Sequence, residues 1–153
     1  MCDVELQFTY YWRPVLKNNS EEYEEYYFPE KITLFMKNNY KYPAIYRWNI
    51  FKNNPEDKKL IYIGETQELC PRRINGYLNP GSSQQTNKRI KEKFQNYLKD
   101  GYKIRLEILK FDNIKVGNFT LTNEDLQDKH VRCFLEELMI VVYKQKRFKI
   151  LNL

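Results

Sequence analysis

Alternation of apolar and polar positions predicts strands in four parts of the chain. The predicted strands are residues 4–12, 43–51, 59–66 and 102–108. The polar run at residues 52–58 joins the second and third strands and predicts an antiparallel hairpin. If that hairpin pairs in simple register, Tyr46 lies opposite Tyr62.

Apolar residues at helical spacing predict four helices. The predicted helices are residues 29–37, 71–78, 86–100 and 123–146. The third begins at Thr86 or Asn87, ends before Gly101 and buries a stripe of Ile90, Phe94, Tyr97 and Leu98. The fourth begins at Thr122 or Asn123, and its expected inward positions are Leu126, His130, Cys133 or Phe134, Leu138, Val141 and Val142.

From residue 42 onward these elements follow the order β–β–α–α–β–α. That order predicts an α+β domain over residues 42–153, with a small central three-stranded antiparallel sheet flanked by helices. Residues 1–41 form an N-terminal extension with a turn at residues 17–20 and an acidic, Tyr-rich stretch at residues 21–28. The extension is either an independent docking arm or an addition to the edge of the sheet.

Charge is distributed unevenly over the 153 residues, whose net charge is +6. Residues 1–41 hold five basic and seven acidic residues, so the remainder carries +8. A basic domain that follows an acidic segment suggests binding to a polyanion. An ordinary solvated surface would explain the same charges nearly as well. No apolar run is long enough to span a bilayer, and Asp3 and Glu5 do not suit a signal peptide, so we expect a cytoplasmic or nuclear protein without membrane contact.

Composition removes several kinds of chemistry. Three unpaired cysteines and one histidine exclude a disulfide framework, a four-cysteine zinc site and a multi-histidine metal centre. No Gly-rich phosphate loop or nucleophile-elbow serine is present. An enzyme with this composition must rely on Tyr, Lys, Glu or Asp for acid–base chemistry. His130 is best interpreted as a core histidine.

Arg72 and Arg73 begin a short helix, where a guanidinium fork and helix dipole suit a phosphate. Gly64 allows another group to approach the preceding strand closely. The two arginines, together with Tyr46, Tyr62 and a carboxylate, would suffice for phosphodiester hydrolysis around a metal ion. The competing interpretation is that both tyrosines simply pack in the core or on the surface.

A family resemblance rests on the order of these residues. Ala44-Ile45-Tyr46, then Tyr62-Ile63-Gly64, then Arg73 resembles the GIY-YIG nuclease superfamily over residues 42–153. Further matches to the family pattern are Tyr77, Glu136 and Asn152. One departure is Ala44, which stands where the family has glycine.

The resemblance implies a metal-dependent DNA endonuclease. Glu136, in preference to Glu137, would hold one Mg²⁺ or Mn²⁺ ion, and Tyr46 or Tyr62 would accept a proton from the attacking water. Arg73, in preference to Arg72, would neutralise charge on the phosphate. Tyr77 would position water or orient the base, and Asn152 would tie the C-terminal tail to the active-site face.

Substrate contacts are expected on the following helix as well. Arg72, Lys88, Arg89 and Lys91 are predicted to contact the DNA backbone, although the helical bases also fit a solvated face. The chain ends at Leu153, so specificity is expected from residues 1–41, the loop at residues 79–87, a homodimer or a partner. These features favour a restriction-type or phage or mobile-element nuclease. The alternatives are a catalytically inactive nucleic-acid- or protein-binding module, and a nuclease subunit activated by a partner on residues 1–41.

Overall fold

The computed structural model describes residues 1–19, 24–57 and 59–152. Its strands are β1 (Leu6–Pro14), β2 (Ala44–Phe51), β3 (Leu60–Thr66), β4 (Lys103–Val116), β5 (Phe119–Leu121) and β6 (Lys149–Ile150). Its helices are α1 (Leu34–Asn39), α2 (Ile74–Leu78), α3 (Gln85–Lys99) and α4 (Lys129–Gln145), with a wide helical turn η1 (Leu69–Arg73) and a 3₁₀ helix η2 (Asn123–Gln127). The fold is α+β, as predicted. No helix in the described part of the chain is long and apolar enough to cross a membrane.

Within the described residues the sheet has six strands instead of the expected three. The strand order is β1-β4-β2-β3-β6, with β5 added to the far half of β4. All neighbours are antiparallel except β3 and β6. β5 and β6 were not predicted, because runs of three and two residues are too short to show alternation of apolar and polar positions.

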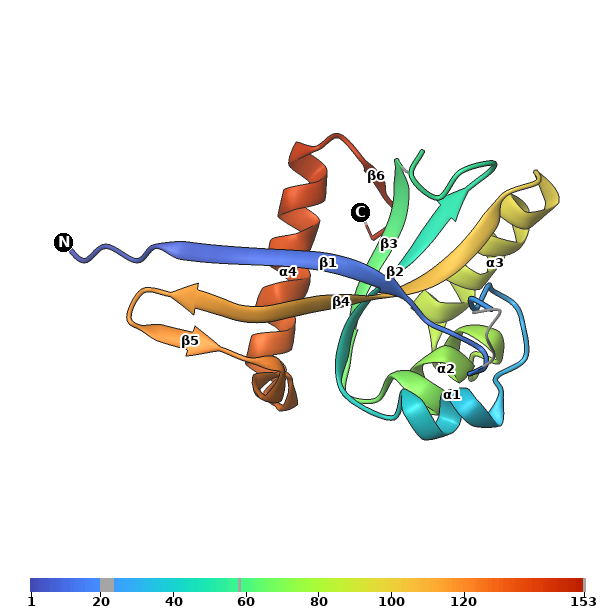
Figure 1. Cartoon of the computed structure of the whole chain (residues 1–153). Coiled ribbons are helices and arrows are strands. Elements are labelled where there is room, and N and C mark those ends of the chain that lie inside the picture. The colour runs from blue at the N-terminus through green and yellow to red at the C-terminus, as the bar shows by residue number, and fades with distance from the viewer. Residues whose placement is uncertain (20–23, 58, 153) are drawn as a thin grey trace.

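Two hydrophobic cores cover opposite faces of the central strands. One is filled from α1, α2, α3 and the segment before α1, and the other from α4 and the side chains of β1. In Figure 1, β2 and β3 accordingly lie between α4 on one side and the other helices on the opposite side. Burial on both faces explains why every residue of β2 is buried.

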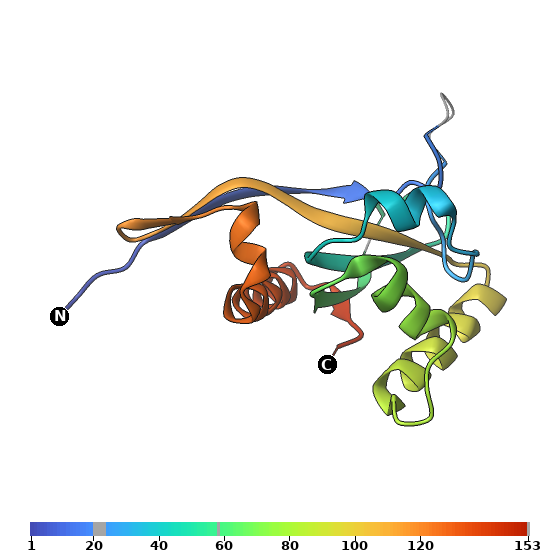
Figure 2. The ribbon, with the colours of Figure 1, turned by 90° about the horizontal axis from the view of Figure 1, so that it is seen from below.

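The N-terminal extension adds to the sheet through β1 and through the residues that precede α1. β1 pairs with β4 from Leu6↔Val116 to Pro14↔Glu107, and the pair forms the long ribbon that passes α4 in Figures 1 and 2. Beyond β1, Tyr26 and Phe28 are buried with their rings against Trp48, at centroid distances of 6.3 and 6.0 Å. Of the two alternatives for this segment, the structure has the addition to the sheet edge. The predicted turn at residues 17–20 and the stretch at residues 21–28 lie partly outside the described residues.

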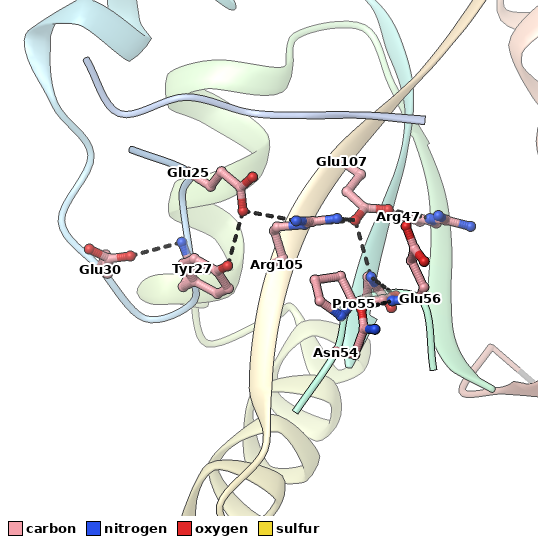
Figure 3. A network of polar contacts seen from close by, with 10 residues as sticks. Glu25, Tyr27, Glu30, Arg47, Asn54, Pro55, Glu56, Arg105 and Glu107 are labelled. Atoms are coloured by element: carbon pink, nitrogen blue, oxygen red, sulfur yellow. Dashed lines mark hydrogen bonds and ion pairs between the residues drawn. The ribbon is translucent and has the colours of Figure 1, made fainter. Parts of the chain in front are cut away.

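A buried polar network also holds this segment to the sheet (Figure 3). Glu107 on β4 pairs with Arg47 on β2 at 2.6 Å and with Arg105 at 2.6 Å, and Arg105 reaches Glu25 at 2.8 Å. Asn49 donates to Glu107 at 3.1 Å. The Arg47 guanidinium also lies 4.4 Å from the centroid of a Trp12 ring. We call this set, Glu25, Arg47, Asn49, Arg105 and Glu107, the paired network.

Two predicted helices differ in extent from those observed. The helix expected at residues 29–37 begins after Thr33, whose hydroxyl caps the Met36 N–H at 3.1 Å, and it runs to Asn39. The helix expected at residues 123–146 divides at Asp128, which has extended backbone and caps α4 through the His130 N–H at 2.8 Å. In both cases a side-chain oxygen satisfies free N–H groups and resets the helix start.

The inward face of the helix expected at residues 123–146 was predicted correctly only in part: Leu126 is buried, and Leu138 and Val142 pack against the core, as expected. In α4 the buried residues are Arg132, Leu135, Met139, Ile140 and Tyr143, whereas Phe134 and Val141 are exposed. His130 is exposed, so its interpretation as a core histidine is wrong. Because apolar residues occur all around this helix, the choice of face depends on where the helix begins.

Candidate active site

The candidate site lies along the free edge of β3. β6 covers only the first part of that edge, where the Leu151 N–H donates to the Ile61 carbonyl at 2.9 Å. The following backbone groups are bound by side chains. Those side chains belong to Asn152, Glu136 and Arg73, which are all predicted site residues.

Asn152 continues the strand pairing with its amide side chain. Its Oδ1 accepts from the Ile63 N–H at 2.9 Å, and its Nδ2 donates to the Ile63 carbonyl. A side-chain amide has the same donor and acceptor as a peptide group, so it can substitute for a strand residue. Asn152 therefore fixes β3 between Tyr62 and Gly64, and its predicted position beside the site residues is the observed one.

Glu136 and Arg73 lie further along the same edge. The Glu136 carboxylate accepts from the Glu65 N–H, and Arg73 Nη2 donates to the Glu65 carbonyl at 3.4 Å. Glu137, by contrast, is exposed. Neither Arg73 nor Glu136 forms an ion pair with any residue the structure describes. An unpaired cation and an unpaired anion thus face the same stretch of β3.

The pKa of Glu136 is raised to about 7. Burial is the main cause, followed by the negative charges of Glu65 and Glu137, while the Glu65 N–H and Arg73 oppose the shift. A carboxylate in this setting gains free energy by binding either a proton or a metal cation. Its donor chemistry fits a hard divalent cation that keeps most of its water ligands.

Among the described residues, no three His, Cys, Asp or Glu side chains form a metal-binding group.

Tyr46 and Tyr77 meet in the interior beside this edge. Their hydroxyls are 2.6 Å apart, and each residue is only 1% exposed. Burial raises the pKa of both phenols, and the Arg73 cation opposes that shift. Tyr62 is half-buried, and its ring centroid lies 6.1 Å from that of Tyr77. Of the three tyrosines, Tyr62 is the one with access to solvent.

The strand register explains how Tyr46 enters this cluster. β2 pairs Tyr46 with Gly64 and Trp48 with Tyr62. The prediction that Tyr46 lies opposite Tyr62 is therefore wrong, because the observed register differs from it by two residues. A Cβ atom built on Gly64 would overlap Tyr46 Oη and Cζ. The close approach expected at Gly64 is therefore made by the Tyr46 ring.

Two site residues were not selected from the sequence. The Glu65 carboxylate pairs with Arg132 Nε at 2.8 Å, and Arg132 Nη1 also donates to the carbonyls of Leu126 and Gln127. Arg132 is 5% exposed. In the sequence, Arg132 stands out only as a charged residue within an apolar helix. The predicted inward face of that helix did not include it.

The remaining predicted DNA contacts are divided between two places. Arg72 is exposed and lines a cavity of about 350 Å³ together with Arg73, Glu65 and Arg132. On α3, Lys88 donates to the Ser82 carbonyl at 3.2 Å and Lys91 to the Leu78 carbonyl at 2.8 Å, while Arg89 is exposed. Arg72 and Lys91 both line a second, larger concave surface.

Comparisons with known proteins do not assign this chain to a family. The residues of the candidate site come from the continuous stretch of β2, β3, η1 and α2 and from α4, which begins about 50 residues later. A scan against models of protein families gave no match, and searches of characterised proteins and of solved structures gave none either.

Proposed function

We propose that the protein is a metal-dependent DNA endonuclease of the GIY-YIG type. The observation that carries this proposal is the convergence of Tyr46, Tyr62, Tyr77, Arg73 and Glu136 at one edge of β3. These are the side-chain types needed to bind a phosphodiester, a divalent cation and an attacking water.

The finer fold assignment belongs to the same proposal. β2, β3 and β4 with α2, α3 and α4 would correspond to the family's catalytic domain, with β2 central in an antiparallel β3-β2-β4 arrangement. β1, α1 and the segment between them would be additions particular to this chain. Ala44 stands where the family has glycine. Its methyl group fits at this position, because Ala44 is buried in β2 opposite Thr66.

In the proposed reaction, Arg73 binds the scissile phosphate and offsets the charge that develops on it. Tyr62, which retains solvent access, orients the attacking water and, when deprotonated, accepts its proton as the water oxygen bonds to phosphorus and the P–O bond to the leaving oxygen breaks. Tyr46 and Tyr77 hold the site's interior wall through their hydroxyl contact. Glu136 would hold a Mg²⁺ or Mn²⁺ ion, which when bound supplies positive charge for the water and the leaving oxygen.

One observation favours the second candidate, a catalytically inactive nucleic-acid-binding module. Tyr46 and Tyr77 are almost fully buried and satisfy each other's hydroxyls, as core residues do. In such a module Arg73 and Glu136 would serve binding alone.

Nicking of supercoiled plasmid in Mg²⁺ or Mn²⁺ separates the two candidates. We expect the wild type to nick, and Arg73→Ala and Glu136→Gln each to lower the rate by roughly 10²–10³-fold. Arg72→Ala is the matched control and should retain the rate at saturating DNA within about threefold. Equal nicking by all four proteins would contradict the assignment, and DNA binding without nicking by any would favour the inactive module.

A further inference from the structure

A second concave surface lies beside the candidate active site. It is a groove of about 740 Å³ between residues 29–37 of the N-terminal segment and helices α2 and α3. We call it the N-terminal groove. Its volume is within the range of sites that enclose nucleotide-sized ligands.

The groove is positively charged. Its lining includes the basic residues Lys31, Lys37, Arg72 and Lys91 and contains no acidic residue. None of these four forms an ion pair with a residue the structure describes. Unpaired cations around a concavity create a potential that attracts a polyanion.

Two acidic residues of the N-terminal segment that the structure describes, Glu25 and Glu30, are bound to other partners. Glu30 binds Lys17 and the Tyr27 N–H, and Glu25 binds Arg105 in the paired network. A segment whose net charge is negative therefore presents lysines to the groove.

The interior of the groove suits the other parts of a nucleotide. Pro29, Ile32, Pro71 and Leu78 supply apolar surface, on which a sugar or base can pack. Asn75 and Gln95 add amide groups that can donate or accept hydrogen bonds at base edges. Cationic residues, an apolar surface and amides together match a DNA strand better than an acidic peptide, which would leave the apolar surface unused.

Arg72 connects the groove to the candidate active site. It lines both the groove and the smaller cavity that contains Arg73. A strand whose scissile phosphate binds Arg73 can therefore continue past Arg72 toward Lys31 and Lys37.

We propose that the N-terminal groove binds the nucleotides next to the cleaved phosphodiester, with Lys31 and Lys37 contacting their phosphates. The inference rests on the proposed nuclease function and adds a defined role for residues 29–37. The N-terminal segment then contributes directly to substrate binding.

The test measures binding of a fluorescent duplex to the Glu136→Gln protein over a range of salt concentrations. Adding Lys31→Gln and Lys37→Gln should weaken binding roughly 5- to 20-fold and lower the salt slope by about one to two. The matched control adds Lys103→Gln and Lys115→Gln, which remove the same charge from exposed positions on β4. The control should bind within about twofold of the Glu136→Gln protein. Acetylation footprinting should also show DNA protecting Lys31 and Lys37 more than Lys103 and Lys115.

The outcomes distinguish this inference from the proposed function. If the wild type nicks DNA but the groove variant binds like the control, the groove inference is overturned and the nuclease assignment stands. If no protein nicks DNA but the groove variant alone loses affinity, the groove is supported as a binding site and the nuclease assignment fails. If the groove variant instead loses affinity for an acidic peptide while its DNA binding is unchanged, the groove serves a protein partner and the proposal is wrong.

Discussion

Tyr46 and Arg47 are neighbours on β2 but belong to two polar clusters of opposite character. Arg47 lies in the paired network, where each described charge has a partner within hydrogen-bond distance. Tyr46 lies in the candidate site, where Arg73 and Glu136 lack ion-pair partners and the pKa of Glu136 is raised. Buried charges that neutralise each other hold a fold together, whereas unpaired ones at an accessible edge favour the binding of an external ion.

The largest effect is expected from breaking the paired network. Glu107→Gln leaves the Arg47 and Arg105 cations without their shared carboxylate, and Arg47 is only 2% exposed. Urea unfolding should show a loss of about 3–5 kcal/mol. Glu136→Gln is the matched control in the other cluster and should not destabilise at neutral pH. Equal losses for the two variants would remove the distinction between the clusters.

An intermediate loss of stability is expected from a change at the contact between Gly64 and the Tyr46 ring. Gly64→Ala places a methyl group against the Tyr46 ring and should cost about 1–3 kcal/mol through overpacking. The cost should shrink when Tyr46 is replaced by Leu, which removes the overlapping ring atoms. A double-mutant cycle measured by urea unfolding checks this coupling, and additive losses would refute the close contact.

A pH-dependent effect concerns the titration of Glu136. Its pKa is raised on folding, so the folded state binds the proton more tightly than the unfolded chain does. Its contribution to stability is present below the ordinary glutamate pKa and is lost as pH rises through about 7. The melting temperature of Glu136→Gln should therefore rise relative to wild type between pH 5 and pH 8, measured by thermal denaturation. A difference that is independent of pH would contradict the raised pKa.

Added Mg²⁺ provides a further check on the same pair of proteins. It should stabilise the wild type at pH 8 and leave Glu136→Gln unchanged, because the carboxylate is the expected ligand. Equal stabilisation of both proteins would place the ion elsewhere.

Sequence patterns predicted the central elements of the fold because their periodicity is strong. The alternation around Ile104 and the stripe of Ile90 and Phe94 both correspond to observed burial. The same patterns could not give the face of α4, because its apolar residues surround the helix and its start depends on the Asp128 cap. The pairing between β1 and β4 could not be predicted from these patterns either, because it joins strands that are far apart in the chain.

The candidate site shows the same division. Glu136 and Asn152 were selected through a resemblance, but their common relation to β3 depends on the way the chain folds back on itself. The Glu65–Arg132 ion pair joins β3 to α4, and no local sequence pattern predicts it. The register opposite Gly64 also required the three-dimensional packing of the Tyr46 ring.

The edge of β3 has a consequence for the order of events during synthesis. Ile63 and the Asn152 amide that binds it are 89 positions apart, so β3 leaves the ribosome well before the residues that cover its edge. Contacts between such distant positions are expected late in folding. In the nascent chain, Tyr62 and Arg73 are therefore present before the residues that complete the candidate site. Under the proposed function, the chain can cut DNA only after α4 and the C-terminal tail have been synthesised.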